Sequence, residues 1–177
     1  MHFHQTKLPG VFEIHLDPHL DERGFFARTW CAKEFASNGL NPDLAQSNVS
    51  FNTRKGTLRG MHFQAAPHTE AKLVRCTRGA ICDVVLDLRP ESPAYKSWIA
   101  VTLTSTNRNM VYVPENCAHG FLTLEDETEV FYQMSEFYNA ESARGVRWND
   151  PAFQILWPGK VEVISERDQN YPDFQVK

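Results

Sequence analysis

The stretch AKLVRCTRGAICDVVLDL, from Ala71 to Leu88, decides the fold class of this chain. It contains two segments rich in Val, Ile, Leu and Cys, Ala71–Cys76 and Ala80–Leu88, and Arg78-Gly79 between them is a turn signal. The pattern predicts two neighbouring β-strands that are joined by a tight turn.

The same pattern continues on both sides of this stretch. Further predicted strands are Val11–Leu16, Gly24–Thr29, Ala45–Phe51, Thr57–Phe63, Trp98–Thr104, Asn109–Val113, Gly120–Leu124 and Glu129–Ser135. A short helix is predicted at Ala32–Ser37, ending near Gly39, and a helical turn at Ser165–Asp168. Many short strands with turn residues between them are typical of an antiparallel sandwich or barrel. We therefore expect one all-β domain over residues 1–177, with a few short helices.

Composition excludes several classes of protein. The chain has 177 residues, 42% of them hydrophobic, which suits one globular domain with a real core. A net charge of −4 argues against non-specific nucleic-acid binding, but not against a small anionic ligand. We expect no membrane span and no signal peptide. Cys31, Cys76, Cys82 and Cys117 lack C-x-x-C spacing, which favours reduced thiols in a cytoplasmic protein over a zinc site.

The segment Thr57–Gln64, TLRGMHFQ, carries two polar residues that a core strand should not have. Strict alternation would place Arg59 and His62 on opposite faces. Gly60 between them marks a possible bulge that turns both side chains inward. The alternative is an edge strand with two solvated polar residues.

Other polar residues also lie in apolar strands. Lys72 shares a face with Val74, and a buried Lys is costly unless it is paired or functional; the alternative is a Lys that extends from the barrel rim to solvent. Asp83 is a candidate buried carboxylate that needs a donor, and His119 is one possible partner. Taken alone, Tyr132 is a core aromatic residue.

Together these segments resemble one family. The matching blocks are Asp21–Phe26, Gln46–Ser50, Leu58–Gln64, Ala71–Cys76, Asp87–Arg89, Val113-Pro114 with Ala118–Phe121, Arg147–Pro151 and Ser165–Asp168. In this order they are similar to the dTDP-4-dehydrorhamnose 3,5-epimerase family, from about Gly10 to Pro172. The resemblance implies a cupin jelly roll, a homodimer, and no metal or cofactor. It also implies an isomerase that inverts C3, C5 or both in a nucleotide-linked 4-keto-6-deoxyhexose, in deoxysugar biosynthesis of the O-antigen or lipopolysaccharide type.

The resemblance also implies roles for single residues. His62 matches the base, Asp168 the carboxylate that orients it, Tyr132 the acid on the opposite sugar face, and Lys72 the residue near the enolate. The expected substrate-binding residues are Arg23, Arg28, Gln46, Asn48, Arg59, His119, Tyr138 and Arg167. Of these, Arg23, Gln46 and Asn48 match nucleotide and diphosphate contacts, and Tyr138 matches the aromatic residue that stacks on the base.

These residue types suit proton abstraction beside a ketone. The carbon acid is weaker than imidazolium by roughly 13 pKa units, or about 17 kcal/mol, so a histidine alone cannot remove the proton. Preorganised positive charge at the enolate oxygen must supply the difference, which suits Lys72 and Arg59. A carboxylate on the far imidazole nitrogen sets the tautomer and stabilises the imidazolium.

The chain departs from the family pattern at two positions, where Arg28 and Ala143 replace glutamates. We interpret both as near the nucleotide end of the pocket. An arginine can donate to the bare N3 of cytosine, so a CDP-sugar is an alternative to a dTDP-sugar; neutral drift at a pocket rim is the other interpretation. Whether C3 alone or both centres are inverted also stays open at this point.

Two other functions remain in view. A metal-dependent cupin would need ligands such as His62, Gln64, Glu70 and His119, but glutamine is a poor substitute for imidazole, so we expect no metal. A cupin that only binds sugar nucleotides would need no base–carboxylate pair with an opposed phenol.

Overall fold

The structure, a computed structural model, describes residues 1–175 of the chain. The predicted helix is α1 (Ala32–Ser37), and the predicted helical turn is α2 (Glu166–Gln169). The strands are β1 (His2–Gln5), β2 (Phe12–His15), β3 (His19–Asp21), β4 (Gly24–Phe26), β5 (Gln46–Asn52), β6 (Thr57–Gln64), β7 (Lys72–Arg78), β8 (Ala80–Asp87), β9 (Trp98–Thr104), β10 (Met110–Val113), β11 (Cys117–Thr123), β12 (Thr128–Met134), β13 (Ala143–Gly145) and β14 (Val163–Ile164).

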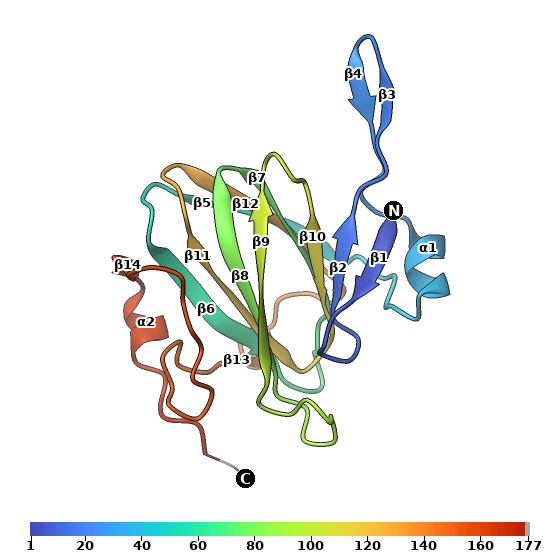
Figure 1. The fold of residues 1–177 in the computed structure, drawn as a ribbon. Coiled ribbons are helices and arrows are strands. Elements are labelled where there is room, and N and C mark those ends of the chain that lie inside the picture. Colours follow the sequence, from blue (N-terminus) through green and yellow to red (C-terminus); the bar gives the residue numbers. More distant parts are fainter. Residues whose placement is uncertain (176–177) are drawn as a thin grey trace.

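The strands form two sheets that face each other, as Figure 1 shows. The first sheet has the order β1-β2-β10-β7-β12-β5, and the second has the order β13-β6-β11-β8-β9. The short strand β14 is added to β6 in parallel, while the other pairings are antiparallel. The predicted all-β cupin sandwich is therefore confirmed. The hairpin β3–β4 stands apart and projects beyond the sheets (Figure 1).

Apolar side chains that alternate with other residues along the strands fill the space between the sheets. Val74 and Val130 of the first sheet meet Ile81, Val85 and other apolar residues of the second. This burial of apolar area is the main term that stabilises such a sandwich. Two further clusters cover the outer faces: α1 places Phe35 against Tyr112 on the first sheet, and the loops after β13 place Phe153 on the second.

Four strands were not predicted from the sequence: β1, β3, β13 and β14. Each has at most four residues, too few for alternation to give a signal. β13 and β14 exist because β6 offers them backbone partners, a tertiary cause that no local pattern records. Within residues 1–175, no helix has the length and apolar character that a membrane crossing requires.

The predicted irregularity at Gly60 is present. His62 pairs with His119, but Arg59 pairs with Phe121, so β6 has one residue more than β11 between these pairs. Gly60 has φ +132°, and a Cβ there would lie 2.5 Å from the Cα of Gly120. The edge-strand alternative is wrong, because β6 lies between β13 and β11.

Candidate active site

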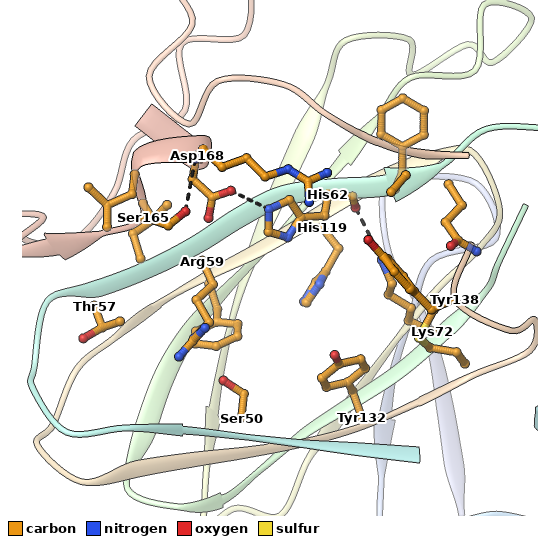
Figure 2. Close-up of a pocket in the computed structure, with 18 of the residues that line it drawn as sticks. Ser50, Thr57, Arg59, His62, Lys72, His119, Tyr132, Tyr138, Ser165 and Asp168 are labelled. Carbon is orange, nitrogen blue, oxygen red and sulfur yellow. Dashed lines mark hydrogen bonds and ion pairs between the residues drawn. The ribbon is translucent and has the colours of Figure 1, made fainter. Parts of the chain in front are cut away.

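A cavity of about 760 Å³ opens between the two sheets. Strands β5, β7 and β12 line it from the first sheet, β6 and β11 from the second, and the segment from β14 to α2 closes one side. The bulge at Gly60 lets Arg59 and His62 both point into this space (Figure 2). The cavity therefore collects polar side chains from strands that are otherwise apolar.

His62 and Asp168 form the central contact of the cavity (Figure 2). The His62 Nε2 atom lies 2.7 Å from the Asp168 Oδ1 atom, and the Gly60 N–H donates to Oδ2 over 3.3 Å. Burial alone would raise the pKa of the Asp168 carboxyl, but the hydrogen bonds from His62, Gly60 and Ser165 hold it below its ordinary value. The carboxylate is thus ionised at neutral pH, and Nδ1 is the nitrogen that His62 has available for a substrate.

A second histidine–carboxylate pair lies beside the first. His119 Nε2 is 2.7 Å from Asp83 Oδ2, the partnership that the sequence suggested. Asp83 is fully buried, and this burial raises the pKa of its carboxyl against the opposing charges of His119 and Lys72. The pair fixes His119 at the cavity wall next to His62.

Lys72 is a buried ion-pair partner and does not extend to solvent. Its Nζ atom lies 2.7 Å from Glu70 Oε1 and 3.4 Å from the carbonyl oxygen of His62. Both side chains line the cavity and are almost fully buried. Glu70 is the ion-pair partner of Lys72 in a place where an unpaired Lys would be costly.

Tyr132 faces His62 from the other side of the cavity (Figure 2). Burial raises the pKa of its phenol, while the charge of Arg59 acts in the opposite direction. Arg59 is itself held by Asn52, whose Oδ1 atom accepts from Nε at 2.7 Å. The cavity thus offers an imidazole on one side and a protonated phenol on the other.

Tyr138 and Arg167 lie at the rim of the cavity. Tyr138 is 56% exposed, so its ring is free to contact a ligand. Its backbone N–H donates to Gln46 Oε1 at 2.8 Å, and Gln46 in turn donates to Asn48 over 3.3 Å. Gln46 and Asn48 do not line the cavity; they support the loop that carries Tyr138.

Arg23 and Arg28 are not brought to the cavity of their own chain. Arg23 lies in the β3–β4 hairpin with its side chain 85% exposed and paired to Asp21. Arg28 follows the hairpin and pairs with Glu34 of α1 at 2.8 Å. Of the two positions that depart from the family pattern, only Ala143 lines the cavity.

Sequence reasoning missed several residues that shape the site. Asn52 orients Arg59. Asn48, Ser50 and Asn52 alternate along β5 and so share one face of the strand, a polar pattern in the sequence that indicates Asn52 as a site residue. Ser165 caps α2 and accepts from the Asp168 N–H. The sequence indicated Glu70 only as a possible metal ligand, whereas in the structure it pairs with Lys72.

The side chains considered as metal ligands do not form a metal site in the described residues. Among residues 1–175 there is no group of three or more His, Cys, Asp or Glu side chains that could hold a metal ion. The Gln64 amide donates to the carbonyl oxygens of His68 and Phe137, and its oxygen accepts from Asn139. Gln64 therefore holds loops together and does not face the cavity with a free donor.

Known proteins match the chain over nearly its whole length. The family model described as dTDP-4-dehydrorhamnose 3,5-epimerase matches residues 5–176. A dTDP-4-dehydrorhamnose 3,5-epimerase of Sinorhizobium fredii is 40% identical over 98% of this chain and 90% of that protein. The crystal structure of the enzyme from Elizabethkingia anophelis has a TM-score of 0.95 at 36% identity, covering 98% of this chain and 96% of that one.

A related activity occurs in the same fold. A 3'-monoepimerase from Streptomyces bikiniensis, solved in complex with dTDP-quinovose, has a TM-score of 0.88 at 31% identity, covering 96% of this chain and 86% of that one. These matches make the chain an isomerase, a nucleotide-sugar epimerase of deoxysugar biosynthesis. The chain belongs to the dTDP-4-dehydrorhamnose 3,5-epimerase family.

Proposed function

We propose that this chain inverts both C3 and C5 of a dTDP-linked 4-keto-6-deoxyhexose, with His62 as base and Tyr132 as acid. The observation that carries the proposal is the position of these two groups on opposite sides of one cavity, with Asp168 bonded to His62. Inversion needs a proton to leave one face of the carbon and another to arrive on the other face, and this arrangement suits that demand.

The reaction begins with transfer of a proton to His62. Nδ1 of His62 takes the proton from the carbon beside the ketone, and the C–H electrons form a C=C bond while the carbonyl π electrons move to oxygen. Asp168 stabilises the imidazolium that results. The Lys72 ammonium, paired with Glu70, stabilises the enolate oxygen. Tyr132 then donates its proton to the opposite face of the carbon, and the enolate returns to the ketone.

The protonation state of Tyr132 supports its role as the acid. Burial raises the pKa of the phenol above its ordinary value, so the hydroxyl keeps its proton at neutral pH. Once the proton is given to carbon, the phenolate is stabilised by the nearby Arg59 charge. His62 and Tyr132 return to their starting protonation states by exchange with solvent.

The assignment of the base to thymine rests on the S. bikiniensis neighbour, which binds a dTDP-sugar. Inversion of both centres is proposed because relatives at about 40% identity are named 3,5-epimerases, whereas the 3'-monoepimerase is 31% identical.

We further propose that the protein is a homodimer, because it exposes apolar surface that a second copy would cover. Leu20 and Phe26 of the hairpin are 81% and 72% exposed, and Val49 and Phe51 lie exposed on the edge strand β5. Apolar surface of this kind marks an interaction site. Because Arg23 sits on the same projecting hairpin, its expected diphosphate contact would be made in the cavity of the partner (Figure 1).

The cytoplasm is the compartment that we propose for this protein. All four cysteines are free, and burial raises the pKa of Cys76 and Cys82 to about 11 and that of Cys117 to about 12. Such thiols stay protonated and inert, which suits a reducing environment.

The proposal is tested by NMR in deuterated water with dTDP- and CDP-4-keto-6-deoxyglucose as separate substrates. Deuterium at both C3 and C5 of the dTDP-sugar is the expected result. Deuterium at C3 alone would make the protein a monoepimerase, and a preference for the CDP-sugar would overturn the base assignment. Absence of exchange with either sugar nucleotide would overturn the catalytic proposal itself.

A further inference from the structure

The carboxylate that meets His62 is carried by a segment with little structure of its own. Asp168 lies in α2, a helix of four residues, which is too short to be stable without tertiary contacts. On its N-terminal side the segment is held by β14, which pairs with Thr57 and Leu58 of β6. The position of Asp168 therefore depends on what holds the chain on its other side.

Three residues after Asp168, the ring of Tyr171 occupies the place of a missing side chain. A Cβ on Gly145 would lie 2.2 Å from Cζ and 2.4 Å from Cε2 of Tyr171. The φ angle of Gly145 lies outside the left-handed region, so its backbone conformation does not require glycine. Glycine is needed at this position only because the Tyr171 ring fills the space above it.

The space above Gly145 that the Tyr171 ring fills, called the notch below, lies next to the strand that carries the base His62. Gly145 pairs with His62 across β13 and β6, so the notch lies beside the backbone that carries His62. The Tyr171 ring stands edge-on to the imidazole, with 6.3 Å between centroids and 66° between planes. Tyr171 does not line the cavity itself. It packs against His62 and against the guanidinium of Arg167, which does line the cavity.

We propose that Tyr171, seated in the notch at Gly145, is a positioning residue for the His62–Asp168 pair. The ring holds the end of α2 against β13 and limits rotation of the imidazole, so the carboxylate stays within hydrogen-bond distance of Nε2. The inference rests on the proposed function only in treating the His62–Asp168 pair as the base. That Tyr171 keeps the two side chains within hydrogen-bond distance does not depend on the reaction.

The first test fills the notch. Gly145→Ala adds one methyl group that displaces the Tyr171 ring, and we expect kcat to fall about 10-fold or more, because misplacement of a catalytic group by about 1 Å has large effects. KM should stay within about 2-fold, because Tyr171 lies outside the cavity. Gly159→Ala is the matched control: its Cβ would meet its nearest neighbour, Leu122, at 3.8 Å, an ordinary contact. This control should leave kcat unchanged.

The second test removes the ring. Tyr171→Ala should lower kcat with KM nearly constant, whereas Tyr171→Phe keeps the ring atoms that fill the notch and should restore kcat to within about 2-fold. In the double variant Gly145→Ala/Tyr171→Ala the added methyl has nothing to displace. We therefore expect its kcat to equal that of Tyr171→Ala, a non-additive result. Tyr171→Ala should fold, because Arg147–Asp173 and the Phe174 N–H to Asp150 still anchor the chain beyond it.

The third test needs no substrate. Because Asp168 is an ionised acceptor, Nε2 of His62 carries the hydrogen, and ¹⁵N NMR of the free protein should report this single tautomer. In Gly145→Ala and Tyr171→Ala the signal should shift toward a mixture of tautomers, while in Gly159→Ala and Tyr171→Phe it should not. A purely structural role for Tyr171 would lower thermal stability without changing this signature.

The outcomes separate this inference from the proposed function. A wild-type kcat and tautomer signal in Gly145→Ala or, if that variant does not fold, in Tyr171→Ala would overturn the inference. The inference would also be overturned if the fall in kcat of the double variant equalled the product of the falls in the two single variants. If the wild-type protein exchanges no sugar proton at all, the proposed function fails, but the tautomer measurement still decides whether Tyr171 positions the pair.

Discussion

His62 and His119 lie opposite each other on neighbouring strands, but their carboxylates differ in environment. The carboxylate of Asp168 accepts from His62 and from the Gly60 N–H, and its pKa is lowered. Asp83 is fully buried, and its pKa is raised. The lowered pKa makes Asp168 the better partner for an imidazole that must accept a proton, because the carboxylate is ionised and stabilises the positive charge.

The first prediction at the residue scale concerns the base. His62→Ala should lower deuterium incorporation by about 100-fold or more, since general bases contribute roughly 10²–10⁴ to rate. Binding of dTDP, measured by calorimetry, should stay close to the wild-type value. His2→Ala, which changes an exposed histidine on β1, is the control. Exchange at the wild-type rate in the His62 variant would contradict the role of this residue.

The second prediction at this scale concerns pH. Because the folded pKa of Asp168 is below its ordinary value, the native state binds fewer protons than the unfolded state between these two values. Its contribution to stability is therefore full above the ordinary pKa of about 3.9 and is lost as pH falls through the folded value. Thermal denaturation should show Asp168→Asn to be less stable than wild type at pH 6, with a difference that shrinks on acidification.

The control for this pH experiment is Asp43→Asn, which changes an exposed carboxylate in the loop before β5. It should follow the wild-type curve over the same range. A constant difference between Asp168→Asn and wild type from pH 6 to pH 3 would mean that the charge of Asp168 does not stabilise the native state.

At the scale of elements, the bulge in β6 determines which side chains enter the cavity. Gly60 combines a positive φ with close approach to the Gly120 backbone, so a side chain there meets both strain and a clash. We expect Gly60→Ala to lower the free energy of unfolding by about 3 kcal/mol or more, as measured with denaturant. Gly159→Ala, at a roomy site, should change it little. If Gly60→Ala changed the free energy of unfolding as little as Gly159→Ala, β6 would accommodate the bulge without glycine.

The C-terminal segment is the second element on which the site depends. β14 joins the second sheet in parallel, α2 follows, and Tyr171 packs over Gly145. None of these contacts is large, but together they bring a residue from near the end of the chain to a strand more than a hundred positions earlier. The position of the Asp168 carboxylate therefore depends on how firmly this segment is anchored.

At the scale of the whole molecule, the hairpin predicts that sites are shared between chains. Arg23→Ala and His62→Ala should each be nearly inactive when expressed alone. Co-expressed, they should regain about a quarter of the wild-type activity, since half of the dimers are mixed and one of two sites in each is intact. Activity is measured as deuterium exchange on the purified mixture. A mixture as inactive as its components would show that Arg23 does not serve the site of a partner.

Most of the sheet-forming strands, the helix Ala32–Ser37 and part of the cavity lining could be predicted from the sequence, whereas β1, β3, β13 and β14 could not. The prediction was possible because alternation and turn residues are local signals, and because Arg59, Lys72 and Asp83 are out of place in apolar strands unless they are used. The sequence also indicated the bulge, since only an irregularity at Gly60 turns both Arg59 and His62 inward.

Only the tertiary structure shows several of the contacts around the site. Glu70 pairs with Lys72, Tyr171 fills the space above Gly145, and Arg23 and Arg28 lie away from the cavity of their own chain. The contact of Tyr171 joins segments that are distant in sequence, and the positions of Arg23 and Arg28 depend on the direction in which a hairpin leaves the sheet. Local composition carries no record of either, because the free energy that selects them comes from packing and charge pairing across the folded molecule.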